Sequence, residues 1–340
     1  MTELYLIRHA EAEGNIFRRL QGQYDSMITP NGLRQIRALS ERFRDIPVDA
    51  VYASDLTRTC TTAGALCRPK ALPLHKDRRL REIGCGVWEN TPFAEFERLD
   101  PQSSYDFSHR PTVWRAEGSE PFSVYTGRFL QALRELALRH DGQTVAVFSH
   151  GMVLRGSLQT LFFPDDENAV QHCENTAVTH LTFENDAFRL DYLNDDSHIT
   201  PEISTVGRQQ WWRKGDHRDF NMWYRDPAPQ DAALLGALGI VPGGRRVRVA
   251  LLHDTPVGAA SFDAENGLLF DLALLPEHRG IGLSPQLLGE TISLSRAAGA
   301  RTLRLGRVPE EPAARALFAA YGFSGTPAAL ELQPHVVWTF

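Results

Sequence analysis

Cysteine, lysine and long apolar runs are scarce in this 340-residue sequence. No stretch of 18 apolar residues occurs, which excludes a membrane-spanning helix, and the first residues enter a strand-like pattern without the apolar core of a secretory signal. The four cysteines, Cys60, Cys67, Cys85 and Cys173, form neither a CxxC pair nor a metal-ligand spacing. We therefore expect reduced, buried thiols in a cytoplasmic protein without a membrane partner.

Positive charge is not in excess either. The chain carries 36 Lys+Arg against 42 Asp+Glu, a formal net charge of −6. Residues 1–200 hold 22 basic and 28 acidic side chains, whereas residues 201–340 hold 14 of each. Because a nucleic-acid surface normally shows a basic excess, neither half predicts a nucleic-acid partner.

The length fits about two domains, at roughly 150 residues each. Apolar runs typical of strands, followed by helix-like apolar spacing, occupy residues 4–7, 48–53 and 144–148. We expect Thr29 and Ser54 to cap the helices that they precede. A hairpin turning at Asn185-Asp186 closes this half. The alternation predicts an α/β fold with a mostly parallel sheet flanked by helices.

A polar stretch at residues 194–206 separates two patterns, and we place the domains at residues 1–199 and 207–340. The second half shows hairpin signals such as Asn266-Gly267 before a helix–strand–helix ending, which predicts an α+β fold with a mixed sheet. Four aromatic residues near its start are interpreted as packing residues of this domain or of the domain interface: Trp211, Trp212, Trp223 and Tyr224.

Three predicted strands of the first half end in polar groups: Arg8-His9, Ser54 with Arg58, and Ser149-His150. Since open α/β sheets bind ligands at the carboxyl ends of their strands, these side chains should share one crevice. Arginine pairs bidentately with phosphoryl oxygens, and nearby cations favour a neutral, nucleophilic histidine. With a carboxylic acid to protonate the leaving alkoxide, this set suits a phosphate ester.

Five segments resemble, in order, the motifs of the histidine phosphatase superfamily, also called phosphoglycerate mutase-like. They are LIRHAEAEGN (6–15), QGQYDSMITPNG (21–32), SDLTRTCTTA (54–63), LREIGCGVWEN (80–90) and FSHGMVLR (148–155). The resemblance covers about residues 1–199, and Ala10 stands where the signature usually has glycine.

The resemblance implies a metal-independent phosphatase of small phosphate esters in which His9 is phosphorylated and Glu82 is the general acid. The other residues it assigns are Arg8, Arg58 and His150 around the phosphoryl group, and Asn15, Gln21 and Gly22 lining the pocket. A mutase would need further cations over the pocket. Between Glu82 and His150 the arginines are scattered among acids, which favours a phosphatase and leaves a phosphoglycerate-type mutase as the alternative.

A strand, a glycine-bearing turn and a helix follow at residues 272–288, with Ser284 as the expected helix cap. Backbone amides bared by Gly280 and Gly282 would face an anion. This segment resembles the acetyl-CoA pyrophosphate motif of the GNAT acetyltransferase superfamily, and AARALFAAYGF (313–323) resembles that family's carboxyl-terminal helix. The resemblance implies a cofactor site made of Leu274, Arg279, Gly280, Ile281, Gly282, Leu283 and Ser284.

One departure concerns chemistry in this second domain. The family's tyrosine, often the acid that protonates the departing thiolate, falls at Phe318, and Tyr321 lies three residues away on another helix face. We expect a bifunctional protein with a phosphatase, which needs no cofactor, and an N-acetyltransferase using acetyl-CoA and an amine acceptor. The alternative is an active phosphatase with a catalytically silent CoA-binding domain. The oligomeric state stays open.

Overall fold

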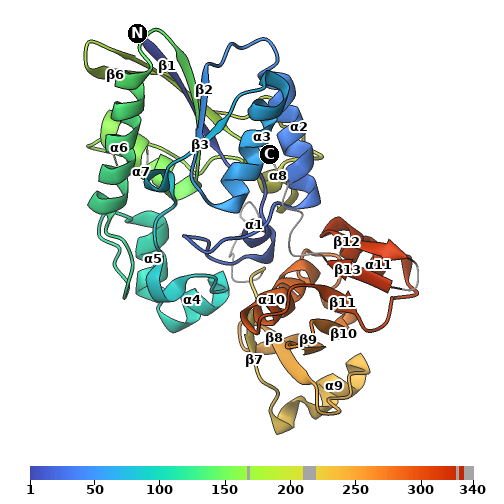
Figure 1. The fold of residues 1–340 in the computed structure, drawn as a ribbon. Coiled ribbons are helices and arrows are strands. Elements are labelled where there is room, and N and C mark those ends of the chain that lie inside the picture. Colours follow the sequence, from blue (N-terminus) through green and yellow to red (C-terminus); the bar gives the residue numbers. More distant parts are fainter. Residues whose placement is uncertain (167–168, 210–219, 327–328, 333–340) are drawn as a thin grey trace.

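The computed structural model describes the chain except residues 167–168, 210–219, 327–328 and 333–340, so Trp211 and Trp212 lie outside the described residues. A six-stranded sheet in the order β3-β2-β4-β1-β5-β6 forms the centre of the first half (Figure 1). Its strands are β1 (Thr2–Arg8), β2 (Ala50–Ala53), β3 (Leu74–Lys76), β4 (Thr144–Ser149), β5 (Val178–Glu184) and β6 (Ala187–Asp195).

Strands β1 to β4 pair in parallel, whereas β5 and β6 run antiparallel and complete the sheet. The turn between β5 and β6 has positive φ at Asn185 and Asp186, which suits a tight hairpin. The mostly parallel first sheet is therefore confirmed.

Helices cover both faces of this sheet, with α2 (Pro30–Arg42) and α3 (Thr57–Lys70) on one face and α6 (Phe122–Arg139) and α7 (Gly151–Phe162) on the other (Figure 1). Because side chains alternate along a strand, Leu4 and Leu6 join the core with α6 and α7, while Tyr5 and Ile7 join the core with α2 and α3. The shorter helices of this half are α1 (Glu13–Phe17), α4 (Phe93–Leu99), α5 (Pro101–His109) and α8 (Thr205–Gln209).

The structure tests the three predicted helix caps, Thr29, Ser54 and Ser284. Thr29 is the N-cap of α2, and its hydroxyl accepts the Gly32 N–H at 3.0 Å, as predicted. The prediction for Ser54 was wrong, because α3 starts only at Thr57 and the carboxylate of Asp25, from a distant loop, accepts the Thr57 N–H at 2.7 Å. The prediction for Ser284 was wrong by one residue, since Ser284 is already inside its helix.

The second half contains a seven-stranded mixed sheet in the order β12-β13-β11-β10-β9-β8-β7. Only β10 and β11 pair in parallel among its described strand pairs. The strands are β7 (Trp223–Arg225), β8 (Arg246–Leu252), β9 (Thr255–Asp263), β10 (Leu268–Leu274), β11 (Leu303–Leu305), β12 (Phe323–Thr326) and β13 (Ala329–Leu332). The helices are α9 (Ala232–Leu238), α10 (Ser284–Ala297) and α11 (Pro312–Ala320). This arrangement confirms the predicted mixed sheet, and Tyr224 is buried in its core.

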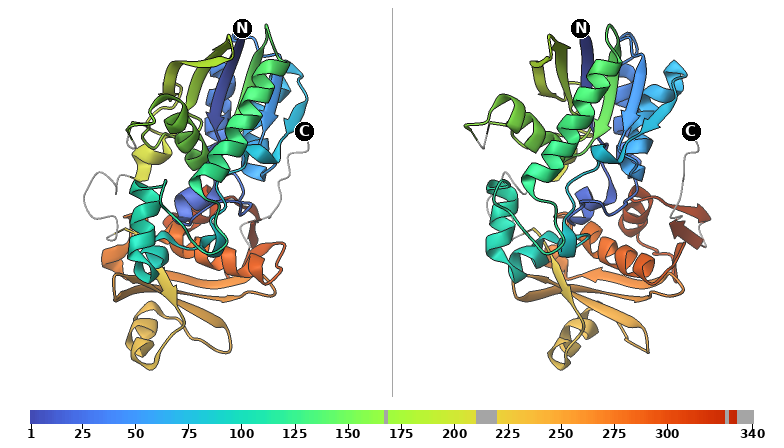
Figure 2. Two further views of the ribbon diagram at one scale, coloured as in Figure 1. Left: turned by 90° about the vertical axis from the view of Figure 1, so that its left-hand side faces the viewer. Right: turned by 60° about the vertical axis from the view of Figure 1, so that its left-hand side comes forward.

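The two halves meet where α1 packs against α10 (Figure 2). The Phe17 ring, from the first half, is buried in the apolar core of the second. A Cβ atom on Gly289 of α10 would lie 2.3 Å from Cγ of Phe17, so only glycine admits the ring at this distance.

Buried charges surround this contact. The carboxylate of Glu290 accepts from Arg19 Nη1 at 2.8 Å and from Arg248 Nε at 3.0 Å, which joins one arginine of each half to one carboxylate. Arg296 donates to Glu13 at 2.6 Å, again across the interface. The apolar and charged contacts thus fix α1 onto α10.

The connecting residues lie against the first half. The carbonyl of Ile203 accepts from Gln35 Nε2 at 2.8 Å, and the Thr205 hydroxyl donates to Glu11 at 2.8 Å. The domain boundary between residues 199 and 207 stays a prediction. All four cysteines are free thiols, three buried and Cys173 half-buried, and no helix in the described ranges combines the length and apolar character needed to cross a bilayer.

Candidate active site

His9 directly follows β1, at the carboxyl end of the parallel strands. Its side chain is buried, and its Nδ1 lies 2.8 Å from the carbonyl oxygen of Ala10. A carbonyl can only accept, so this contact assigns the proton to Nδ1 and leaves the lone pair on Nε2. Burial lowers the pKa of His9 well below 6.5, and the charges of Arg58 and Arg8 lower it further. His9 is therefore a neutral imidazole with a nucleophilic nitrogen.

His150 follows β4 and lies beside His9, with 5.3 Å between the ring centroids. Arg58, in the first turn of α3, donates from Nε to Nδ1 of His150 at 3.2 Å. Since the guanidinium can only donate, His150 carries its proton on Nε2. That Nε2 is buried and has no hydrogen-bond partner among the described residues. His150 thus offers one N–H to an anion next to His9.

Arg58 is itself fixed by the loop after α1. Its Nη1 donates to the carbonyl of Tyr24 at 2.8 Å and its Nη2 to the carbonyl of Gly22 at 2.7 Å. A Cβ atom at Gly22 would lie 2.4 Å from the Ile83 carbonyl oxygen, so glycine is required for this approach. Gly22 therefore acts through its backbone by positioning the Arg58 guanidinium.

Of the other two predicted pocket residues, Asn15 lies within α1 and Gln21 lies in the loop that follows it. Asn15 accepts the Ala12 N–H on Oδ1 at 2.9 Å, and the same oxygen lies 3.4 Å from Nδ2 of Asn175. The Gln21 side chain lies against Gly14, and its Oε1 is buried without a hydrogen-bond partner in the described parts of the chain. Asn15 thus holds the turn that follows His9, while Gln21 retains an unused acceptor.

Glu82 is held at the amino end of α7. Its Oε2 accepts the Met152 N–H at 2.9 Å, and its Oε1 accepts the Val153 N–H at 2.7 Å. Burial raises the pKa of Glu82 and outweighs these amides and the charge of Arg58, which lower it. A carboxyl group with a raised pKa, held at the amino end of the helix that His150 caps, has the character required of a general acid.

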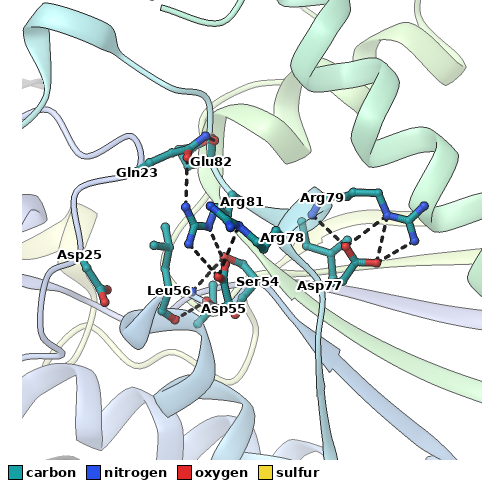
Figure 3. Close-up of polar contacts among 12 residues, drawn as sticks. Gln23, Asp25, Ser54, Asp55, Leu56, Asp77, Arg78, Arg79, Arg81 and Glu82 are labelled. Carbon is teal, nitrogen blue, oxygen red and sulfur yellow. Dashed lines mark hydrogen bonds and ion pairs between the residues drawn. The ribbon is translucent and has the colours of Figure 1, made fainter.

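Arginines that follow β3 pair with nearby aspartates (Figure 3). Arg81 donates to Asp55 at 2.7 Å and to Gln23 at 3.3 Å, and its contact lowers the pKa of Asp55. Arg79 pairs with Asp77 at 2.8 Å. These ion pairs hold the segment that carries Glu82.

Two further residues near the site were missed from the sequence. Asn175 donates from Nδ2 to the carbonyl of His9 at 2.9 Å. The Nε2 atom of His172 lies 3.2 Å from Nη1 of Arg8, whose Nη1 also donates to the Cys173 carbonyl. Both residues precede β5, whose amino end meets the carboxyl end of β1 because the two strands are antiparallel. The sequence predicted the hairpin of β5 and β6 but not that β5 pairs with β1. Without that pairing, the place of these two residues beside the site could not be predicted.

Positive charge near Arg8 comes from outside the segment between Glu82 and His150. The pKa of His172 is lowered to about 3, first by the charge of Arg8, then by burial and by the charges of Arg155 and Arg18. In contrast, Arg98 lies over the ring of Trp223 at 4.3 Å, at the domain interface. Arg128, which does lie between Glu82 and His150, also lowers the pKa of His150, so the choice between phosphatase and mutase stays a prediction.

The predicted cofactor loop connects β10 to α10. Gly280 and Gly282 have φ of 77° and 90°, and a Cβ atom at either would meet nothing within 4 Å. Arg279 donates from Nε to the Leu274 carbonyl at 2.9 Å and closes the loop. Gly280, Ile281 and Gly282 line a cavity of about 430 Å³, so the open backbone fits an anionic group there. Leu283 is buried and Ser284 begins α10.

The two aromatic residues of the last helical segment have different surroundings. Phe318 is buried in the second core, where its ring contacts Phe323 at a centroid distance of 5.1 Å. Tyr321 lines the cavity, and burial raises its pKa to about 12. Of these two residues, Tyr321 and not Phe318 therefore belongs to the cavity lining.

Two family models match the chain, and the matches overlap at residues 186–196. The sequence model of the histidine phosphatase superfamily (branch 1) matches residues 4–196, and that of the acetyltransferase (GNAT) family matches residues 186–323. "Probable phosphoglycerate mutase GpmB" of Proteus mirabilis is 29% identical over 207 residues, which are 59% of this chain and 96% of that protein. "Phosphoserine phosphatase 1" of Hydrogenobacter thermophilus is 32% identical over 155 residues, 46% of this chain and 74% of that protein.

Two solved structures resemble the first half. Bacillus stearothermophilus YhfR has 31% identity and a TM-score of 0.57, covering 59% of this chain and 100% of its own. A mycobacterial glucosyl-3-phosphoglycerate phosphatase has 24% identity and a TM-score of 0.54, covering 57% of this chain and 99% of its own. The second likeness shows the fold alone.

Proposed function

Because the chain belongs to the histidine phosphatase superfamily (branch 1) through residues 4–196, we propose that its first domain, residues 1–199, hydrolyses small phosphate monoesters through a phosphohistidine on His9. The observation that carries this proposal is the pair of complementary histidines. The Nε2 atom of His9 bears a lone pair, whereas the Nε2 atom of His150 bears a proton and has no partner among the described residues.

The proposed reaction has two steps. In the first, Nε2 of His9 forms a bond to phosphorus while the bond to the ester oxygen breaks, and Glu82 gives its proton to that oxygen. In the second, water attacks phosphorus, Glu82 takes up the water proton, and the bond to His9 breaks to release inorganic phosphate. Arg8, Arg58 and His150 stabilise charge on the non-bridging oxygens, the usual source of catalysis in phosphoryl transfer.

A phosphate-release screen over a library of small phosphate esters tests this activity. The blank is His9→Ala, so contaminating phosphatases are subtracted. Phosphoserine and phosphoglycerate are the first compounds to include, because relatives of the first domain carry these names. Absence of His9-dependent phosphate release from every compound would contradict the proposed hydrolysis.

The role of Glu82 predicts a dependence on the leaving group. We expect Glu82→Gln to lower turnover of an alkyl phosphate by roughly 10²–10⁴-fold, because the alkoxide needs a proton, and to affect an activated aryl phosphate far less. Wild-type kcat/KM for the alkyl ester should fall as pH rises through the raised pKa of Glu82, which must be protonated. It should also fall as pH drops through the pKa of His9, which must be neutral, and this acidic limb should lie below pH 6.5 because the pKa of His9 is lowered. Equal losses on both esters would show that Glu82 is not the acid.

A phosphoglycerate-type mutase is the second candidate for the first domain. The observation that favours it is the positive charge of Arg155 and Arg18, which together with Arg8 lowers the pKa of His172. Activity that requires a bisphosphate primer and returns an isomer still carrying phosphate would identify a mutase. Release of inorganic phosphate without a primer identifies a phosphatase.

For the second domain, residues 207–340, we propose binding of acetyl-CoA through the backbone of residues 279–284. The open Gly280 and Gly282 backbone supports this proposal. When bound, acetyl-CoA supplies an acetyl thioester, and the proposed acceptor is an amine. Calorimetric titration with acetyl-CoA tests the binding, and thiol release over an amine panel then separates an acetyltransferase from a silent CoA-binding domain.

A further inference from the structure

The cavity beside the glycine loop is shared by both halves of the chain. Its volume is about 430 Å³. The second half contributes the loop, the start of α10 and Tyr321, while the first half contributes α1 and the segment just after His9. Helix α8 of the connection forms a third wall. The first-half and connecting residues in the lining are Glu11, Ile16, Arg18, Thr205, Arg208 and Gln209.

The charged groups of this cavity favour an anion. Glu11 is already satisfied, because its carboxylate accepts from the Thr29 hydroxyl at 2.6 Å, from Asn31 Nδ2 at 3.1 Å and from the Thr205 hydroxyl at 2.8 Å. Arg208 approaches Glu11 only at 4.0 Å, and its side chain is 44% exposed. Glu11 keeps its negative charge, but the lining holds two arginines, Arg18 and Arg208, against this one carboxylate, so its charged side chains are positive in sum.

Arg18 adds a second guanidinium. This residue lines the cavity, its Nε donates to Asn221 of the second half at 2.9 Å, and burial lowers its pKa to about 9. A desolvated guanidinium is stabilised by an anion at close range, because the attraction is strong where water is excluded. Arg18 and the glycine loop thus present donors to the same cavity.

We propose that Arg18 and Arg208 complete the acetyl-CoA site of the second domain by binding its phosphate groups together with the backbone of residues 280–282. The ligand would then contact α1, α8 and α10 at once. This inference rests on the proposed CoA binding and adds that the phosphatase half supplies part of the cofactor site. Recognition would depend on the multiple phosphates of CoA, which need more donors than the loop amides alone provide.

Calorimetric titration of the full chain with acetyl-CoA tests the proposal. Arg208→Gln is the decisive variant, because this side chain is half exposed and its contact with Glu11 is long. We expect its affinity to fall about tenfold, the effect of removing one charge-assisted hydrogen bond. Arg208→Lys should recover part of the loss. Arg37→Gln, an exposed arginine of α2 away from the cavity, is the matched control and should bind as wild type.

Two further variants separate the possible failures. Gly282→Ala adds a Cβ atom to a backbone with φ of 90°, which strains the loop. This change to the loop should by itself abolish binding. Arg18→Gln should weaken binding while the unliganded chain keeps its cooperative unfolding. If Gly282→Ala loses binding but Arg208→Gln and Arg18→Gln match Arg37→Gln, the first half takes no part and this inference is wrong. If wild type binds no acetyl-CoA, the proposed CoA binding itself is wrong.

Inorganic phosphate distinguishes the source of the bound anion. If the cavity instead takes phosphate released by the first domain, phosphate at low millimolar concentration should bind with the same dependence on Arg208, and acetyl-CoA should not compete with it. That outcome would overturn the assignment to CoA. Hydrogen exchange gives a second readout, because acetyl-CoA should protect residues 13–18 and 205–209 as well as residues 280–287.

Discussion

His9→Ala should lose turnover of phosphate esters by a factor on the order of 10⁶, the scale seen when a nucleophile is removed from a covalent mechanism. Alanine has no atom that can replace Nε2, whereas Arg8, Arg58 and His150 remain in place to bind the phosphoryl group. The substrate affinity should therefore change little while kcat collapses. Steady-state phosphate release gives both quantities, provided that the variant is fully folded.

The control for this experiment is His109→Ala, which removes an exposed histidine of α5 and should retain wild-type turnover. A chemical readout complements the rates, because wild type quenched during turnover should carry an acid-labile phosphoryl group that is missing from His9→Ala. Turnover by His9→Ala within tenfold of wild type would contradict the nucleophile assignment, as would a labelled His9→Ala protein.

The second large effect concerns stability at the domain interface. Glu290→Ala should lower the free energy of unfolding by about 3 kcal/mol, because Arg19 would lose a partner in a buried setting. The two side chains are only 4% and 8% exposed, so water cannot replace the carboxylate without opening the interface. Arg248 would lose the same partner but keep its contact with Asp226 at 2.8 Å. Urea unfolding followed by tryptophan fluorescence measures the change.

Two controls accompany Glu290→Ala. Glu277→Ala removes an exposed carboxylate and should change the unfolding free energy by less than about 0.5 kcal/mol. Glu290→Gln keeps acceptor oxygen and should fall between the two. Because the pair is buried, the loss should persist at high salt, where surface pairs are screened. A Glu290→Ala midpoint equal to that of Glu277→Ala would show that the buried pair contributes nothing net.

Helix caps could be predicted from the sequence where residues next to them in the chain determine the cap. Thr29 caps α2 because the following proline and its own hydroxyl suffice. Ser54 failed because Asp25, from another loop, takes the amino end of α3, and no local pattern reports such a contact. The strand-end argument brought His9 and His150 together correctly, since parallel strands end at one edge of the sheet.

Contacts between segments that are far apart in the chain could not be predicted from the sequence. His172 meets Arg8 only because β5 pairs antiparallel with β1, so the order of strands had to be known first. The same holds for Phe17, which lies in the first half of the chain but is buried in the core of the second. Its true neighbour is Gly289, and the docking of two folded units is not encoded in the periodicity of either.

The contact between Phe17 and Gly289 also bears on how this gene can be divided. A cut between the two folds would leave one product with an exposed Phe17 ring and an Arg19 without its carboxylate partner. The other product would lack the ring that packs on Gly289, and its Glu290 would keep only Arg248 of its two arginine partners. Separate expression would therefore require surface redesign on both sides. While the chain stays whole, the cell makes the two sites in a fixed one-to-one ratio, whatever the transcript level.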